Sequence, residues 1–154
     1  MHSQLGAISP LDGRYQNSVK ELNAYFSEAA LMRYRIYVEI EYLIALSLEK
    51  KIKDLPPLSD KQQKRLRSIY QNFDIRSAEM VKQLEKKTNH DVKAVEYFIQ
   101  TKCKTSLHPW IHFALTSEDV NNLSYSLMWK HGLKEVYLPT LIHVHRELKK
   151  MARK

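Results

Sequence analysis

The sequence is poor in residues that interrupt helices, and it has almost no cysteine. Its 154 residues include three glycines, five prolines and one cysteine. Long stretches with helical apolar spacing separate these breaks, so we expect an all-α protein that is long enough to bury a core. The lone cysteine, Cys103, excludes an internal disulfide and suits a reducing compartment. We expect it to pack near a helix end rather than to react.

The sequence also lacks an apolar run long enough to cross a bilayer, because charged residues break the best candidate. These residues are Arg33, Arg35, Glu39 and Glu41. The first residues do not show the basic-then-apolar pattern of a secretion signal. We therefore expect a soluble cytoplasmic protein without a membrane partner.

Acidic residues are too few to balance the basic ones. There are 17 acidic and 25 basic residues, which gives a formal net charge of +8. Such an excess favours anionic partners, either nucleic acid or small phosphorylated and carboxylated molecules. The basic pairs lie at the ends of expected helices, form no arm or stripe, and so disfavour a nucleic-acid partner. The pairs are Lys50-Lys51, Lys86-Lys87 and Lys149-Lys150.

A long helix over residues 29–48 is expected at the centre of the fold. It is apolar on most faces, which is typical of a helix that is buried on several sides. Its charged residues must therefore pair with each other or with neighbours. Ser27 is placed to cap this helix, and Ser59 with Gln62 forms a capping box for a later one. Further helices are expected over residues 17–25, 60–73 and 74–86.

The segment Thr88-Asn89-His90-Asp91-Val92 begins another helix, which we expect to run to about residue 102. Thr88 and Asn89 are good N-cap residues, and the charge of Asp91 complements the helix dipole. His90 would then lie in the first turn beside free N–H donors, a position suited to binding an anion. From these residues alone, a plain helix start with a surface histidine is the simpler interpretation.

The segment Ser9-Pro10-Leu11-Asp12-Gly13-Arg14-Tyr15 combines a turn with two residue types that bind ligands. Proline presets φ and Gly13 can take a positive φ, so we expect the chain to turn here. The turn presents a guanidinium fork on Arg14, which suits phosphate or carboxylate, and a hydroxyl on Tyr15. Alone, the segment would be only a turn with exposed polar side chains.

A third polar segment, Thr116-Ser117-Glu118-Asp119, starts a further helix. Thr116 or Ser117 would cap it, and the hydroxyls, free N–H groups and helix dipole together suit a carboxylate ligand. Asn121 and Asn122 follow inside the helix although asparagine is a poor helix former. Either the side-chain amides of these two residues form specific contacts, or the side chains are simply exposed to solvent.

Two histidines precede this helix at a spacing that could suit a metal. His108 and His112 are four residues apart, but a proline falls between them and no third ligand is evident. We therefore expect a short packed connector and no metal.

The last helical pattern runs from residue 117 past Pro139, which is expected to bend the helix or to start a new segment. Apolar residues then recur at spacings of four and three, which is typical of a helix that packs along other helices. This seam comprises Tyr137, Leu141, Val144, Leu148 and Met151. Because no stop signal follows it, we expect the sequence to be a fragment that ends within a helix.

Three of these segments together resemble the adenylosuccinate lyase family, in the form common among bacteria, within the fumarase/aspartase superfamily. The family motifs S-P-x-D-G-R-Y, T-x-H-D-V-x-A and T-S-x-D occur here in that order. The resemblance implies an N-terminal helical domain over residues 1–115 and the truncated start of a central helical-bundle domain over residues 116–154. It also implies a homotetramer.

The resemblance further implies a lyase that eliminates fumarate from adenylosuccinate, giving AMP, and from the succinylated aminoimidazole carboxamide ribotide of purine biosynthesis. This β-elimination breaks a carbon–nitrogen bond with a base and an acid and needs no cofactor. By this resemblance, Arg14 and Tyr15 would hold the nucleotide. Asn89, His90 and Asp91 would line the substrate site. Thr116 and Ser117 would bind the succinyl part.

Two family segments with catalytic residues are missing from this sequence. T-H-G-Q-P, which carries the general-acid histidine, is absent, as is S-S-x-M-P-x-K-x-N, the mobile loop with the catalytic serine. We therefore expect no catalytic residue within these 154 residues, no lyase activity from them alone, and a binding role for His90. The alternative is a basic all-α adaptor whose C-terminal seam binds a helical partner or RNA.

Overall fold

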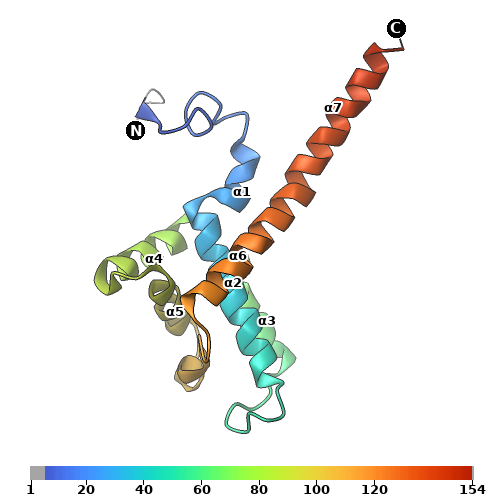
Figure 1. The fold of residues 1–154 in the computed structure, drawn as a ribbon. Coiled ribbons are helices and arrows are strands. Elements are labelled where there is room, and N and C mark those ends of the chain that lie inside the picture. Colours follow the sequence, from blue (N-terminus) through green and yellow to red (C-terminus); the bar gives the residue numbers. More distant parts are fainter. Residues whose placement is uncertain (1–5, 154) are drawn as a thin grey trace.

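The computed structural model describes residues 6–153, and every regular element within them is helical (Figure 1). The predicted all-α fold is confirmed. None of the helices in this range is both long enough and apolar enough to cross a membrane. The α-helices are α1 (Asn23–Phe26), α2 (Glu28–Ser47), α3 (Asp60–Gln71), α4 (Ile75–Thr88), α5 (Asp91–Lys102), α6 (Ser117–Gly132) and α7 (Leu138–Met151). Lys20–Leu22 and Thr105–Trp110 form 3-10 helices, and Leu133–Tyr137 forms a π-helical segment.

Helix α2 lies at the centre, with α3, α4, α5 and α6 packed around it (Figure 1). Its Ile36 and Ile40 are completely buried and share one core cluster with Phe98 and Ile99 of α5. Burial of a side chain of this size contributes about 1.5–3 kcal/mol. This cluster therefore fixes the position of α5, which carries part of the candidate site, against α2.

The helix starts follow the predicted capping rules. The Ser27 hydroxyl accepts a hydrogen bond from the N–H of Ala30 at 3.1 Å, and α2 begins directly after it. Ser59 and Gln62 form the predicted capping box before α3. These caps satisfy N–H groups that have no partner inside their own helix, so the starts of both helices are determined locally.

The helix predicted over residues 17–25 is shorter than expected and divided in two. It consists of the 3-10 helix Lys20–Leu22 followed by α1. Hydrogen-bonded turns occupy the residues before it: the N–H of Val19 donates to the carbonyl of Tyr15 at 3.1 Å. The helix can begin only after these turns end.

Helix α6 approaches α1 closely at Gly132. A Cβ atom at this position would lie 2.7 Å from two carbon atoms of the Phe26 ring. The same ring meets Trp129 edge to face, with the ring centroids 5.3 Å apart. Any residue larger than glycine would displace the ring, so Gly132 permits the packing that holds α1 against α6.

The residue after α5, Cys103, is half-buried against the core. Burial raises the pKa of its thiol. The expectation that Cys103 packs near a helix end is confirmed.

Helix α7 projects away from the rest of the molecule, and none of its residues is buried (Figure 1). The π-helical segment precedes it because Pro139 has no N–H to donate within the helical ladder. Leu141, Leu148 and Met151 of the predicted seam are 48%, 59% and 70% exposed. A change of helical geometry near Pro139 is confirmed, whereas the domain boundary between residues 115 and 116 stays a prediction.

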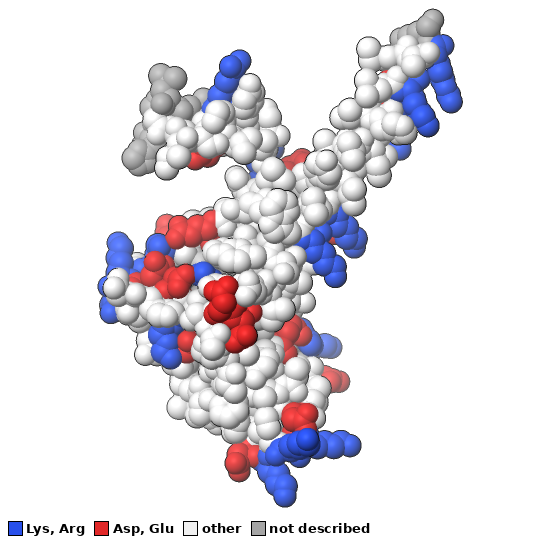
Figure 2. Space-filling model, in the orientation of Figure 1, with Lys and Arg blue, Asp and Glu red and all other residues white. Residues whose placement is uncertain are grey.

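Basic side chains occur at several separated places on the face drawn in Figure 2, among them the end of α7. They do not form a continuous stripe on this face, and acidic side chains lie between them. A protein that follows a nucleic-acid backbone needs a contiguous basic surface. This face does not offer one.

Candidate functional site

The residues Thr88–Asp91 form a tight junction between α4 and α5. Thr88 is the last residue of α4, and Asn89 is its C-cap with a left-handed φ of 51°. Asparagine adopts this conformation more readily than most residues that have a Cβ. The prediction that Thr88 and Asn89 cap α5 is wrong. Because the chain reverses at Asn89, the N-cap position moves to His90.

His90 caps α5 with its ring. Its Nδ1 atom accepts a hydrogen bond from the N–H of Lys93 at 3.2 Å, and its side chain is 51% exposed. The other ring nitrogen, Nε2, makes no hydrogen bond to the part of the chain that the structure describes. His90 is therefore oriented by the helix it caps and leaves Nε2 available to a ligand at the start of α5.

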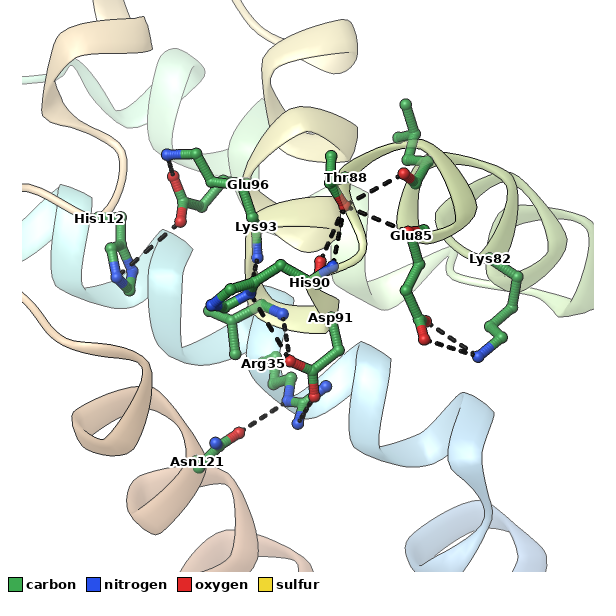
Figure 3. A network of polar contacts seen from close by, with 12 residues as sticks. Arg35, Lys82, Glu85, Thr88, His90, Asp91, Lys93, Glu96, His112 and Asn121 are labelled. Atoms are coloured by element: carbon green, nitrogen blue, oxygen red, sulfur yellow. Dashed lines mark hydrogen bonds and ion pairs between the residues drawn. The ribbon is translucent and has the colours of Figure 1, made fainter.

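Arg35 of α2 joins the start of α5 to α6 (Figure 3). Its Nη2 atom donates to Oδ2 of Asp91 at 2.6 Å, and its Nε atom donates to Oδ1 of Asn121 at 2.9 Å. Arg35 is buried, whereas Asp91 is half-exposed. The amide of Asn121 is thus used, which resolves the choice left open by the sequence. This bridge places the α4–α5 junction beside α6.

The charge of Asp91 is stabilised by this arrangement. Burial acts against the charged form, but Arg35 and the N–H of Val92 outweigh it and hold the pKa of Asp91 below its usual value. Oδ1 accepts from that N–H at 2.8 Å. Asp91 is therefore an anion at neutral pH, and both of its carboxylate oxygens accept hydrogen bonds at the junction.

The start of α6 is a capping box, so Thr116 is the N-cap and Ser117 the first helical residue. The hydroxyl and the N–H of Thr116 both donate to Oδ2 of Asp119 at 2.7 Å. These hydrogen bonds from Thr116 lower the pKa of Asp119. The half-buried Ser117 makes no side-chain hydrogen bond with the rest of residues 6–153. Ser117 is therefore the hydroxyl that remains for a ligand.

A buried network that the sequence did not predict lies between α2, α5 and the loop before α6. Nδ1 of His112 is 2.6 Å from Oε1 of Glu39, and the N–H of His112 donates to Oε2 of the same carboxylate at 3.1 Å. Nε2 of His112 lies 3.9 Å from Oε1 of Glu96, whose Oε2 accepts from Nζ of Lys93 at 2.7 Å (Figure 3). Glu39 and Glu96 are both buried.

The two histidines considered as metal ligands do not share a face. Nε2 of His108 lies 3.0 Å from the carbonyl oxygen of Gln100. His112 has a left-handed φ of 61° and meets Glu39 of α2. Between residues 6 and 153, no group of three or more His, Cys, Asp or Glu side chains is arranged so that it could hold a metal ion. The one sequence signal for the His112 network was a glutamate inside an apolar helix, which had to find a partner.

Arg14 and Tyr15 lie outside this cluster. The guanidinium carbon of Arg14 is 5.3 Å from the centroid of the Tyr15 ring. The turn before them is held by the N–H of Ser9, which donates to Asp12 at 2.9 Å, and Gly13 does not adopt a positive φ. Neither Arg14 nor Tyr15 makes a side-chain hydrogen bond or ion pair with another described residue. The structure therefore brings Asn89–Asp91 beside α6 but leaves this pair apart.

The all-α fold agrees with the family that the sequence matches. The sequence matches the family described as Lyase over residues 13–154, and the chain belongs to this family. Adenylosuccinate lyases are among its curated relatives. That of Legionella pneumophila subsp. pneumophila (strain Philadelphia 1) is 46% identical over 145 residues, covering 91% of this chain and 32% of the relative.

Two further relatives show the same pattern. The adenylosuccinate lyase of Dictyostelium discoideum is 46% identical over 149 residues, which cover 90% of this chain and 31% of the relative. That of Escherichia coli K12 is 44% identical over 142 residues, which cover 89% and 31%. The resemblance inferred from the three motifs is confirmed. The chain spans about a third of the length of these relatives.

Proposed function

We propose that this chain contributes substrate-binding residues to an enzyme that eliminates fumarate from adenylosuccinate to give AMP. The observation that carries the proposal is the Arg35 bridge, which holds the start of α5 beside α6. The dipoles of both helices favour an anion at these starts, and the N–H groups of Ser117 and Glu118 in the first turn of α6 suit a carboxylate group of such a substrate. The relatives at 46% identity, named adenylosuccinate lyases, support the same reaction.

In this proposal the residues of the two helix starts bind the substrate. His90 presents Nε2 beside the first turn of α5, with Asn89 and Asp91 lining the site next to it. Ser117, with Thr116 holding the helix start, binds the succinyl part. The proton transfers of the β-elimination belong to an acid and a base from outside these residues, and no cofactor takes part. The succinylated aminoimidazole carboxamide ribotide, which carries the same succinyl group, is a second substrate.

Arg14 and Tyr15 bind the nucleotide in the proposed enzyme. The experiment compares KM for adenylosuccinate in the complete gene product with that of Arg14→Ala. Because a charge-assisted hydrogen bond contributes about 1.5–3 kcal/mol, we expect affinity to fall by about one to two decades. Arg14→Lys should restore binding only in part, since an ammonium group lacks the planar fork. Lys50→Ala is the control, and an Arg14→Ala variant that behaves like it would refute the nucleotide role.

The exposed seam of α7 supports a homotetramer whose central helices pack together, with residues 116–154 as the start of that bundle domain. An apolar cavity of about 590 Å³ beside it, lined among others by Leu11, Trp129 and Tyr137, adds further apolar surface. Large exposed apolar surfaces drive association. Sedimentation should show self-association that decreases in Leu141→Glu combined with Leu148→Glu. A monomer before and after these changes would refute the assembly.

The lone half-buried thiol, Cys103, suits the proposed cytoplasmic location.

The adaptor interpretation is not favoured by the comparisons, because the family match extends over residues 13–154 and includes α7. On the face drawn in Figure 2, the basic side chains are separated and form no continuous basic surface of the kind that binds RNA.

A further inference from the structure

Glu39 is an acidic residue in the interior of the protein, and only 1% of its surface is exposed. Removing a carboxylate from water is unfavourable unless hydrogen bonds replace the lost solvation. Here both carboxylate oxygens are directed at one residue, His112: Oε1 at its Nδ1 atom and Oε2 at its backbone N–H. Both hydrogen bonds to the buried carboxylate therefore come from a single histidine.

The backbone around His112 is also unusual. Its φ is 61° and that of Ala114 is 56°, both in the left-handed region. A residue with a Cβ in this region carries strain of about 1–3 kcal/mol, which persists only where surrounding contacts enforce it. Two unfavourable features, a buried carboxylate and a strained backbone, thus coincide at one imidazole.

The charged groups around His112 come from three helices. Glu39 belongs to α2, Glu96 and Lys93 belong to α5, and Asp119 of α6 lies close enough for His112 to affect its charge. Lys93 pairs with Glu96 at 2.7 Å. Burial raises the pKa of Glu39, but the hydrogen bonds from His112 oppose this effect.

We propose that Glu39 is a positioning residue that keeps the proton of His112 on Nδ1 and thereby fixes this imidazole just before the start of α6, with Nε2 3.9 Å from Oε1 of Glu96. The backbone N–H of His112 can only donate, so Oε2 of Glu39 must accept from it. Oε1 then accepts from Nδ1–H, and this hydrogen bond determines which ring nitrogen is protonated. His112 precedes α6 and lies near Asp119 in the first turn of that helix, so the inference rests on the proposed function of this helix start.

The substitution Glu39→Gln tests the proposal because glutamine keeps the shape but has only one acceptor oxygen. That oxygen must accept from the backbone N–H, so the NH2 group faces Nδ1 and donates to it. The proton should therefore move from Nδ1 to Nε2, as described for the aspartate-to-asparagine change in the serine protease triad. Glu41→Gln is the matched control, since Glu41 lies on the same helix but pairs with Arg67 and Tyr70.

The first measurement is the nitrogen NMR spectrum of His112 in the 154-residue chain, recorded at a pH where the ring is neutral. We expect protonated Nδ1 in the unchanged protein and in Glu41→Gln, and protonated Nε2 in Glu39→Gln. A wild-type ring protonated at Nε2, or a spectrum that Glu39→Gln leaves unaltered, would overturn the proposal. This measurement does not depend on lyase activity, so it can fail or succeed separately from the proposed function.

The second measurement is a double-mutant cycle in the complete gene product. Glu39→Gln should lower kcat/KM about ten- to hundredfold. In a His112→Gln background it should lower kcat/KM no further, because Glu39 acts through the imidazole. Equal losses in both backgrounds would show that Glu39 only supports the fold, and the positioning role would be rejected.

Discussion

Helices α2 and α7 are both rich in apolar residues, but the chain buries one and leaves the other exposed. Ile36 and Ile40 of α2 are inaccessible to solvent, whereas Leu148 of α7 is 59% exposed. Asp91 and Asn121 are held to α2 by Arg35, and His112 is held to α2 by Glu39. The comparison shows that α2 organises both the core and the site, while α7 is available to other helices.

The largest expected effect is a loss of stability in the core around α2 that has no counterpart on α7. Phe98 is 1% exposed and meets Phe73 edge to face, so Phe98→Ala should lower the free energy of unfolding by about 3–5 kcal/mol. Leu148→Ala, on exposed α7, should change it by less than about 0.5 kcal/mol. Urea unfolding of both variants provides the measurement. Similar losses would mean that α7 packs onto the same chain.

A second effect compares two ion pairs that α2 makes with its neighbours, one buried and one more exposed. Arg35→Ala removes a buried guanidinium with two side-chain partners and should cost about 1.5–3 kcal/mol of unfolding free energy. Arg67→Ala of α3 removes a more exposed ion pair with Glu41 and should lower the free energy of unfolding by less than Arg35→Ala does. Urea unfolding again measures both. Equal losses would contradict the assignment of Arg35 as the link between α5 and α6.

A third effect separates helix capping from ligand binding at His90. Its ring accepts from the N–H of Lys93, so His90→Ala should destabilise the protein by about 1 kcal/mol. His90→Asn should keep the stability because asparagine is a good N-cap, but it should still lose the imidazole contact to substrate. Thermal unfolding measures the first property and KM the second. A stable His90→Asn enzyme with unchanged KM would exclude a substrate role.

The smallest effect is the pH dependence of stability. The pKa of Glu41 is lowered chiefly by Arg67, and that of Asp91 is lowered by Arg35. Because these folded-state values lie below the unfolded ones, the stabilisation is present above about pH 5 and is lost as the pH falls through the folded pKa values. Both groups are partly exposed, so the loss should be about 0.5–1 kcal/mol. Unfolding followed from pH 7 to 3 should show a shallower loss in Asp91→Asn than in the unchanged protein.

The sequence predicted local features well because their causes are local. The caps at Ser27, Ser59 and Thr116 depend on hydrogen bonds that span three residues. A side chain and the helix it begins are enough to determine such a feature. The same reasoning identified α2 as the core helix from its apolar faces.

The features that the sequence did not predict depend on residues far apart in the chain. Arg35 lies 56 residues from Asp91 and 86 from Asn121, and Glu39 lies 73 residues from His112. The left-handed Asn89 moved the N-cap from Thr88 to His90, because that conformation depends on how α4 and α5 pack. Spacing alone carries no information on such contacts.

The most direct test of the account is kcat/KM for adenylosuccinate in Ser117→Ala of the complete gene product. Ser117 opens α6 with a hydroxyl that the capping box leaves available, and its loss should lower kcat/KM about ten- to hundredfold. The matched control is Ser126→Ala, an exposed serine on the same helix, which should change kcat/KM less than about twofold. If Ser117→Ala and Ser126→Ala give the same kcat/KM, the start of α6 does not bind the succinyl group and the central claim is wrong.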